Sequence, residues 1–153
     1  MPSTLSSLLT RLKADYPDIT FDESDDFLWS PSEKTIYYHP YDPHAVPLLL
    51  HELAHATLGH TSYHRDIELI AIERAAWDEA KVNLAPAYGV AIDDDFAEET
   101  LDTYRDWLHS RSTCPHCKAT GLQTKQREYT CLACQHKWRV NEARICALRR
   151  YLI

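Results

Sequence analysis

Two histidines and one glutamate stand within five residues of each other, in the run His51-Glu52-Leu-Ala-His55. A helix turns by about 100° per residue, so the two histidines lie roughly 40° apart and Glu52 lies roughly 60° beyond His55. Both imidazoles can then bind one zinc ion, which makes a bound water far more acidic than bulk water. We therefore expect His51 and His55 to be zinc ligands and Glu52 to be the catalytic base that takes the water's proton.

The residues around this run indicate a buried helix. Leucine, valine and alanine occupy most positions from Val46 to Leu58, and Gly59 is a suitable stop signal. Buried polar side chains need partners, and a metal ion is a suitable partner for two histidines and a carboxylate. The alternative is a buried helix whose histidines only bond neighbouring backbone groups.

A catalytic zinc commonly has three protein ligands, so a further donor is expected downstream. Glu73 is the preferred candidate because it shares a helical face with Trp77, and a carboxylate among apolar neighbours is costly to bury unless it binds a cation. Glu68 and Glu79 are the main alternatives. The alternative to a metal-binding role is that Glu73 pairs with a neighbouring arginine on a solvent-exposed helix face. The remaining candidates are His60, His64, Asp66 and Asp78, of which the histidines are expected to support the site or to be exposed.

The segments around the motif predict further helices and a small sheet. Leucines from Leu5 to Leu12 follow one face of a helix. The turn-rich run 30–34 suits an antiparallel hairpin. Strands are expected at 19–21, 27–29 and 35–38, and helices at about 66–84 and 94–110. The pattern predicts an α+β fold in which a small antiparallel sheet packs with the motif helix and further helices.

Four cysteines have the spacing of a structural zinc site. Cys114 and Cys117 form one Cys-x-x-Cys pair, and Cys131 and Cys134 form the second. Four thiolates at this spacing close a tetrahedral site, so we expect a zinc ribbon whose metal supplies most of its folding free energy. The alternative is a redox role for either pair. Cys146 belongs to neither pair and is expected to pack in a short C-terminal helix.

Charge is distributed unequally along the 153 residues. Residues 1–110 contain 7 Lys/Arg and 21 Asp/Glu, whereas residues 111–153 contain 9 and 2. The change predicts one domain over residues 1–110, and a zinc ribbon with a short C-terminal helix over residues 111–153. The sequence has no apolar run of membrane-spanning length and no signal-peptide core, which predicts a cytoplasmic protein without a membrane partner.

Two stretches together resemble the ImmA/IrrE family of zinc metallopeptidases: His51-Glu-Leu-Ala-His-Ala-Thr-Leu-Gly-His60 and Glu73-Arg-Ala-Ala-Trp-Asp-Glu-Ala80. The resemblance covers roughly residues 15 to 90. It implies a zincin-like metallopeptidase domain over residues 1–110, with one catalytic zinc bound by two helix histidines and a downstream glutamate. The implied substrate is a protein, often a repressor or regulatory protein. The run Ala75-Ala76-Trp77 differs from the family's usual glutamate-alanine-asparagine or glutamate-alanine-aspartate run.

The cysteine module also resembles the zinc ribbon of SprT-like proteases, which implies a DNA-dependent protease. Nucleic acid is a possible partner because aromatic Tyr129 and Trp138 stand among the cations Lys125, Arg127, Lys137 and Arg139. These cations can instead offset the negative charge of a four-thiolate zinc site, or face the acidic part of the chain. A third interpretation is a non-catalytic zinc protein in which the motif helix is only a structural metal site.

Overall fold

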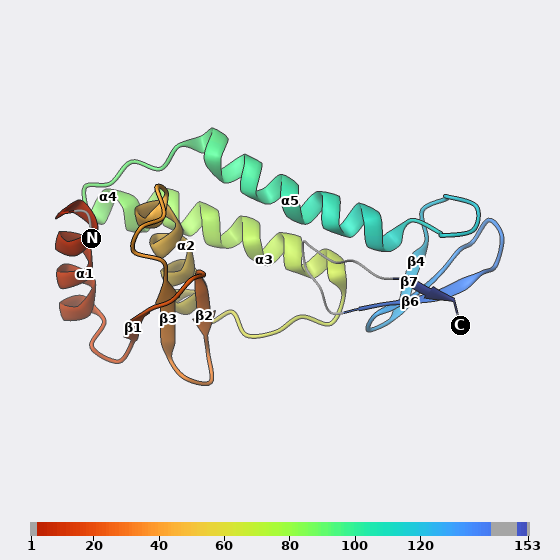
Figure 1. Cartoon of the computed structure of the whole chain (residues 1–153), viewed down its shortest axis with the longest axis horizontal. Helices are drawn as coiled ribbons and strands as arrows, with labels where there is room; N and C mark the ends of the chain where they lie inside the picture. Colours follow the sequence, from red (N-terminus) through yellow and green to blue (C-terminus); the bar gives the residue numbers. More distant parts are fainter. Residues whose placement is uncertain (1–2, 142–149, 153) are drawn as a thin grey trace. The chain divides into compact units, whose positions relative to one another are not determined.

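The computed structural model describes residues 3–141 and 150–152 (Figure 1). The chain divides into two compact units, Met1–Thr61 with Arg74–Asp93 and Ser62–Glu73 with Asp94–Ile153. The helix α3 (Asp66–Glu79) contributes to both units. The predicted division after residue 110 falls within α5 (Asp94–Ser112), which belongs as a whole to the second unit. The predicted α+β fold class is confirmed.

Three short strands precede the motif helix in the first unit. The elements follow in the order α1 (Ser3–Asp15), β1 (Thr20–Glu23), β2 (Leu28–Ser30), β3 (Thr35–Tyr38) and α2 (Ala45–Thr57). β2 and β3 form the predicted antiparallel hairpin, and Lys34 in its turn has a φ of 50°. β1 pairs in parallel with the other edge of β3. This parallel pairing was not predicted, and it arises because β3 returns between β1 and β2 instead of adding outside β2.

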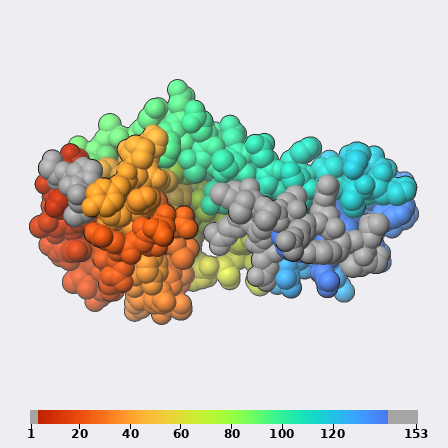
Figure 2. All heavy atoms as spheres, in the orientation of Figure 1, coloured from red at the N-terminus to blue at the C-terminus, as the bar shows by residue number. Residues whose placement is uncertain are grey.

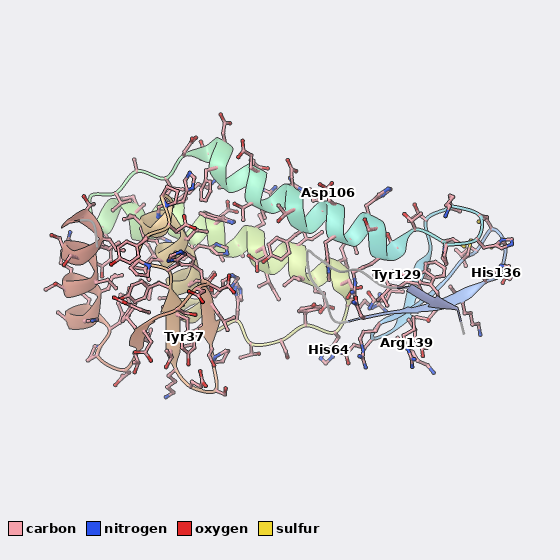
Figure 3. The ribbon with its side chains drawn as sticks, in the orientation of Figure 1. Tyr37, His64, Asp106, Tyr129, His136 and Arg139 are labelled. Atoms are coloured by element: carbon pink, nitrogen blue, oxygen red, sulfur yellow. The ribbon has the colours of Figure 1, made fainter. Side chains whose placement is uncertain are left out.

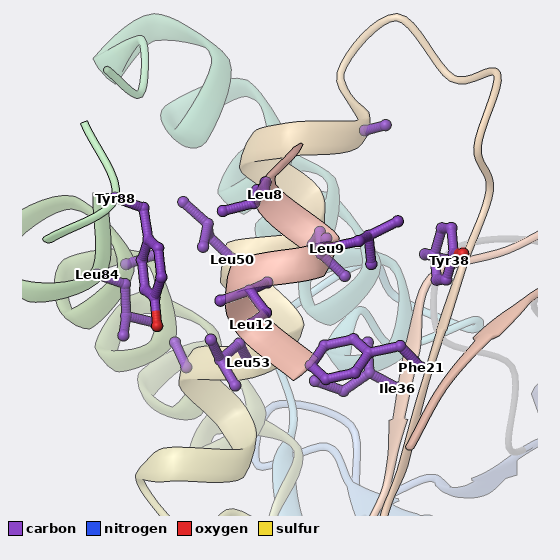
Figure 4. Packing of buried hydrophobic residues seen from close by; sticks show 14 of the residues in the cluster. Leu8, Leu9, Leu12, Phe21, Ile36, Tyr38, Leu50, Leu53, Leu84 and Tyr88 are labelled. Carbon is purple, nitrogen blue, oxygen red and sulfur yellow. The ribbon is translucent and has the colours of Figure 1, made fainter. Parts of the chain in front are cut away.

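Leucines of α1 and α2 form much of the core of the first unit, together with side chains from the sheet (Figure 4). The predicted stripe on α1 is at most 3% exposed and consists of Leu5, Leu8, Leu9 and Leu12. On α2, the fully buried leucines are Leu49, Leu50 and Leu53. In the space-filling view α1 lies directly against the strands of this unit (Figure 2). Burying such a side chain contributes about 1.5–3 kcal/mol, so packing that requires no metal stabilises the motif helix.

The helix after the motif is longer than predicted and includes a π-helical turn. α3 continues into the π-helix η1 (Ala80–Leu84) and the short helix α4 (Ala85–Ala87). The prediction ended this helix before Pro86, but Pro86 lies in the first turn of α4. Pro86 lacks a backbone N–H donor, and it directly follows the π-helical turn, where the hydrogen-bonding pattern of the helix changes. Gly89, with a φ of 67°, follows the end of α4.

The second unit contains α5 and an antiparallel sheet with the strand order β4-β5-β6-β7. The strands are β4 (Leu122–Lys125), β5 (Glu128–Thr130), β6 (Lys137–Val140) and β7 (Arg150–Leu152). The first three lie within residues 111–153, the segment predicted to form the zinc ribbon. β7 was not predicted. The predicted C-terminal helix and Cys146 lie outside the described residues.

A buried ion pair joins the ribbon to α3 and α5 within the second unit. Arg111 donates from Nε to Oδ2 of Asp66 at 2.9 Å, and both side chains are at most 3% exposed. Tyr129 of β5 donates its hydroxyl to the same oxygen at 2.5 Å. Burial and the nearby Asp66 carboxylate raise the pKa of Tyr129, which therefore remains a donor. Arg111 also donates to the carbonyl of Asn141, and the indole of Trp138 donates to the carbonyl of Arg111 at 3.0 Å. These contacts hold the ribbon against α3 and α5 within the second unit.

Two aromatic rings form the centre of the ribbon instead of an exposed binding surface. Tyr129 and Trp138 are 2% and 0% exposed, and their rings stack with centroids 5.6 Å apart. A Cβ atom at Gly121 would lie only 2.3 Å from the Trp138 ring, so this position requires glycine. Neither ring is therefore exposed for stacking on nucleic acid, and contact of the ribbon with nucleic acid stays a prediction that now depends on its cations. Lys137 and Arg139 alternate with Trp138 on β6 and are exposed. Arg139 is labelled in Figure 3.

Candidate metal centres

The helix α2 brings the predicted histidines together on its buried side. His51 Nε2 lies 3.1 Å from His55 Nε2, and the two side chains are 4% and 8% exposed. Zn–N bonds of about 2.0–2.1 Å in a tetrahedral site keep two nitrogens roughly 3.4 Å apart. A carboxylate oxygen of Glu52 completes a group whose ligand atoms all lie within 4.8 Å of one another. The three residues are therefore placed as predicted and are compatible with zinc.

The backbone of the sheet fixes the orientation of Glu52. The N–H of Trp29, in β2, donates to Oε2 of Glu52 at 2.8 Å. β2 is an edge strand, paired with β3 on its other side. The carboxylate is thus held by a backbone group that cannot rotate away, and its position relative to the two histidines depends on the sheet.

Trp77 fixes the ring of His51. The two rings stack with centroids 4.3 Å apart and an interplanar angle of 25°, and Trp77 is completely buried. Trp77 lies in the half of α3 that belongs to the first unit. The stacked indole restricts rotation of the imidazole, so the direction of its ring nitrogens is set by packing.

Burial separates the candidates for a third ligand. Glu73 is only 4% exposed. Glu68 is exposed, and its carboxylate accepts the backbone N–H of His64 at 3.0 Å, which lowers the pKa of Glu68. Glu79 is half-buried and accepts a hydrogen bond from an asparagine side chain one turn later. Asp66 forms the buried ion pair described above. Glu73 is therefore the most buried of the three glutamates proposed as the third ligand. Among the described residues, the group of converging ligand atoms comprises His51, Glu52 and His55, so the role of Glu73 as a ligand stays a prediction.

His60 and His64 follow the motif helix, and the structure places them differently. His60 Nδ1 lies 2.9 Å from His55 Nδ1, and the ring centroids are 5.2 Å apart. This contact agrees with the predicted supporting role of His60. His64 is exposed, which is the other alternative expected for these two histidines (Figure 3).

The four cysteines of the ribbon converge on one point. Sγ of Cys114 lies 3.6 Å from Sγ of Cys134, and Sγ of Cys117 lies 3.4 Å from Sγ of Cys131. All four sulfurs lie within 4.8 Å of one another. A disulfide would require about 2.05 Å. Zn–S bonds of about 2.3 Å give sulfur–sulfur edges of roughly 3.8 Å in a tetrahedron. The arrangement is therefore that of a metal site, and it is compatible with zinc.

The two cysteine pairs lie in matching turns. The residues directly after them, Lys118 and Gln135, have φ angles of 68° and 67°. Each donates its backbone N–H to the carbonyl of the first cysteine of its pair, at 3.0 and 2.9 Å. A left-handed conformation costs a non-glycine residue about 1–2 kcal/mol. Binding of one ion by both pairs would offset this cost.

Neighbouring thiols alter one another's ionisation in this cluster. Burial raises the pKa of Cys114, but backbone N–H groups and adjacent thiols outweigh it and lower that pKa to about 6. A backbone N–H of the same turn is the main cause that lowers the pKa of Cys131. A backbone N–H also acts to lower the pKa of Cys134, yet burial and the other thiols raise it to about 12. Four thiolates this close together need a cation to balance their charge.

Two histidines lie beside the cysteine cluster. His136 Nδ1 is 3.2 Å from Cys134 Sγ, and the rings of His116 and His136 stack with centroids 4.0 Å apart and an angle of 15° (Figure 3). Lone pairs of stacked imidazoles lie in parallel planes and do not converge on one ion. This geometry suits an N–H donated by His136 to a thiolate better than a second metal site.

Sequence reasoning did not identify Trp29 and Trp77 as residues of the site. The spacing of Trp77, four residues after Glu73, was a usable signal because it placed the ring on the same helical face. Trp29 acts through its backbone N–H, which every residue except proline possesses, so no side-chain pattern could have revealed it. Comparison with protein-family models, with curated proteins and with solved structures finds no match for this chain.

Proposed function

We propose that this protein is a zinc-dependent metallopeptidase that hydrolyses peptide bonds of a protein substrate, with repressors or regulatory proteins as the substrate class. The observation that carries the proposal is the pair of Nε2 atoms of His51 and His55, 3.1 Å apart, beside the carboxylate of Glu52. The resemblance of this segment to ImmA/IrrE peptidases supports the same reaction.

In this proposal His51, His55 and Glu73 hold the catalytic zinc ion. Bound zinc acidifies a water molecule and polarises the peptide carbonyl. Glu52 takes the proton of the attacking water and returns a proton to the leaving amine. Because Trp29 holds Oε2, we assign the proton transfer to Oε1. Glu73 is preferred over Glu68 and Glu79 because it is the most buried of the three.

The four cysteines hold a second, structural zinc ion in this proposal. Four thiolate ligands complete a tetrahedral site and leave no position for water. The two zinc ions therefore have different roles in this proposal, and the histidine site is the one that keeps a coordination position for water.

Replacing Glu52 tests the reaction directly. Wild type and Glu52→Gln are incubated with a peptide library prepared from a proteome, and new chain ends are identified by mass spectrometry. Zinc content is measured by elemental analysis. We expect two zinc ions per chain in both proteins, and at least a roughly 100-fold loss of cleavage in the variant. The matched control is Glu33→Gln, which changes an exposed glutamate bonded to Tyr37. Equal cleavage by wild type and Glu52→Gln, or no cleavage by the two-zinc wild type, would contradict the proposal.

The third ligand is tested by comparing three carboxylates on one helix. Glu73→Ala should reduce the zinc content from two ions to one, while Glu68→Ala and Glu79→Ala should leave two. Circular dichroism verifies that each variant is folded. Retention of both ions by folded Glu73→Ala would remove Glu73 from the site.

A second candidate function is a DNA-dependent protease of the SprT type. It is favoured by the exposed cations Lys125, Lys137 and Arg139 of the ribbon sheet. Phosphate contacts of this kind weaken steeply with salt. Binding to labelled single- and double-stranded DNA is measured by anisotropy at low and physiological salt, for wild type and the triple alanine variant. Binding at low salt that the triple variant loses would favour this candidate, and no binding by wild type would exclude it.

A further inference from the structure

We infer that His60 is a positioning residue, which holds the ligand His55 by accepting a hydrogen bond from the ring nitrogen that faces away from His51. The inference rests on the proposed function, because it concerns the same metal site. It assigns a role to the last residue of the His51–His60 segment, outside the motif itself.

The backbone at the end of α2 returns His60 to the side of His55. Gly59 has a φ of 71° and donates its N–H to the carbonyl of Ala56 at 3.2 Å. His60 donates its N–H to the carbonyl of His55 at 3.0 Å. These two hydrogen bonds define a Schellman motif, in which glycine takes the left-handed position. A Cβ atom at Gly59 would meet nothing within 4 Å, so the glycine is required for its backbone conformation and not for space.

The side chains of His60 and His51 approach opposite nitrogens of the His55 ring. His51 Nε2 lies 3.1 Å from His55 Nε2, and His60 Nδ1 lies 2.9 Å from His55 Nδ1. The two nitrogens of an imidazole point to opposite sides of the ring. An ion shared by His51 and His55 therefore lies on the side away from this contact, and His60 touches the ligand instead of the ion.

This arrangement determines which nitrogens carry protons. A neutral His55 that binds a metal through Nε2 carries its proton on Nδ1. That N–H donates to the lone pair of His60 Nδ1, so His60 carries its own proton on Nε2. Such partners fix the orientation of a ligand and increase its basicity, and their loss typically weakens metal binding 10- to 100-fold.

The test measures metal affinity in the full-length protein with three variants. His60→Ala removes the acceptor, whereas His60→Asn supplies an amide oxygen in place of Nδ1. The matched control is His64→Ala, which removes an exposed histidine four residues further along. Zinc affinity of the histidine site is measured by competition with a chelator, and thermal unfolding verifies the fold. We expect affinity to fall roughly 10- to 100-fold in His60→Ala, to recover in His60→Asn, and to stay unchanged in His64→Ala.

Nitrogen-15 NMR of the imidazole rings separates a positioning role from a purely structural one, because it reports which ring nitrogen carries the proton. The zinc-loaded wild type should show His55 protonated at Nδ1 and His60 protonated at Nε2. Equal affinities of His60→Ala and His64→Ala, or a His60 protonated at Nδ1, would overturn the positioning role while leaving the peptidase proposal intact. A wild type that binds only one zinc ion, lost on mutation of the cysteines, would instead refute the proposed function itself.

Discussion

The two candidate metal centres are built in opposite ways. The cysteines of the ribbon lie in two turns with left-handed residues, next to a small core that includes Tyr129, Trp138 and Val140. The histidines lie on a helix that is packed among leucines of the first unit. A zinc ion in the ribbon would therefore supply much of its folding free energy, whereas in the first unit the fold itself supplies the geometry of the histidine site. Chemistry that needs an exchangeable position is better placed on the second kind of site.

The two centres should differ most in how much structure is lost when one of their ligands is replaced, and the largest loss is expected for a ligand of the ribbon. Cys114→Ser removes a completely buried thiolate, and structural zinc contributes on the order of 10 kcal/mol to such small modules. We expect residues 113–140 to lose amide protection in hydrogen exchange, while α2 retains it. Lys118→Ala, which keeps all four thiols, is the control. Full protection of the ribbon in Cys114→Ser would show that the small core is sufficient without the metal.

The next largest effect should come from the buried ion pair beneath the ribbon. Asp66→Ala leaves Arg111 buried without its carboxylate, which should cost about 3–5 kcal/mol in the free energy of unfolding. Glu98→Ala breaks an exposed ion pair with Arg105 on α5 and should have a much smaller effect, because solvent screens the two charges. Urea unfolding measures both variants. Similar losses in the two would mean that burial of the pair has little influence on stability.

A smaller effect, with a characteristic pH dependence, is expected at Tyr129. Its pKa is raised in the folded state, whereas in the unfolded chain the phenol has its ordinary pKa of about 10. Above that pH the unfolded chain releases the proton first, so folding stability should decline as pH rises above about 10. Tyr129→Phe should lose about 1–2 kcal/mol at neutral pH and show less of this alkaline decline. Tyr41→Phe, at a residue that is 73% exposed, should behave like wild type. Equal alkaline declines in wild type and Tyr129→Phe would contradict this assignment.

The smallest effect on the fold should follow the loss of a histidine ligand. His51→Phe removes the ligand nitrogen but keeps an aromatic ring beside Trp77. Zinc content should fall by one ion, and amide protection in α2 should change less than about 10-fold, because leucine packing stabilises the helix. Unfolding of α2 in this variant would remove the contrast between the two centres and favour a purely structural metal.

Features that depend on neighbouring residues were predictable from the sequence. The leucine stripe of α1, the positions of His51 and His55 and the convergence of two cysteine pairs follow from periodicity and spacing. The parallel partner of β3 and the contact of Trp77 with His51 were not predictable. They join segments distant in the chain, whose pairing depends on the packing of the whole unit.

The helix after the motif has one end that was predictable from the sequence and one that was not. Its start at Asp66 was predicted. Its passage through a π turn into Pro86 was not, because a proline ordinarily indicates that a helix has ended. No local pattern distinguished Asp66, which binds Arg111, from the other acidic residues considered as metal ligands.

The pairing of Asp66 with Arg111 and Tyr129 determines how this protein can be divided into fragments. A fragment ending at residue 110, where the charge of the sequence changes sign, would separate the carboxylate from both partners. Such a fragment could lose activity through an uncompensated charge at the start of α3, even if the ribbon had no part in the reaction. Deletion experiments on the ribbon should therefore be paired with a neutral residue at position 66, as in Asp66→Asn, so that a lost function is distinguished from a damaged scaffold.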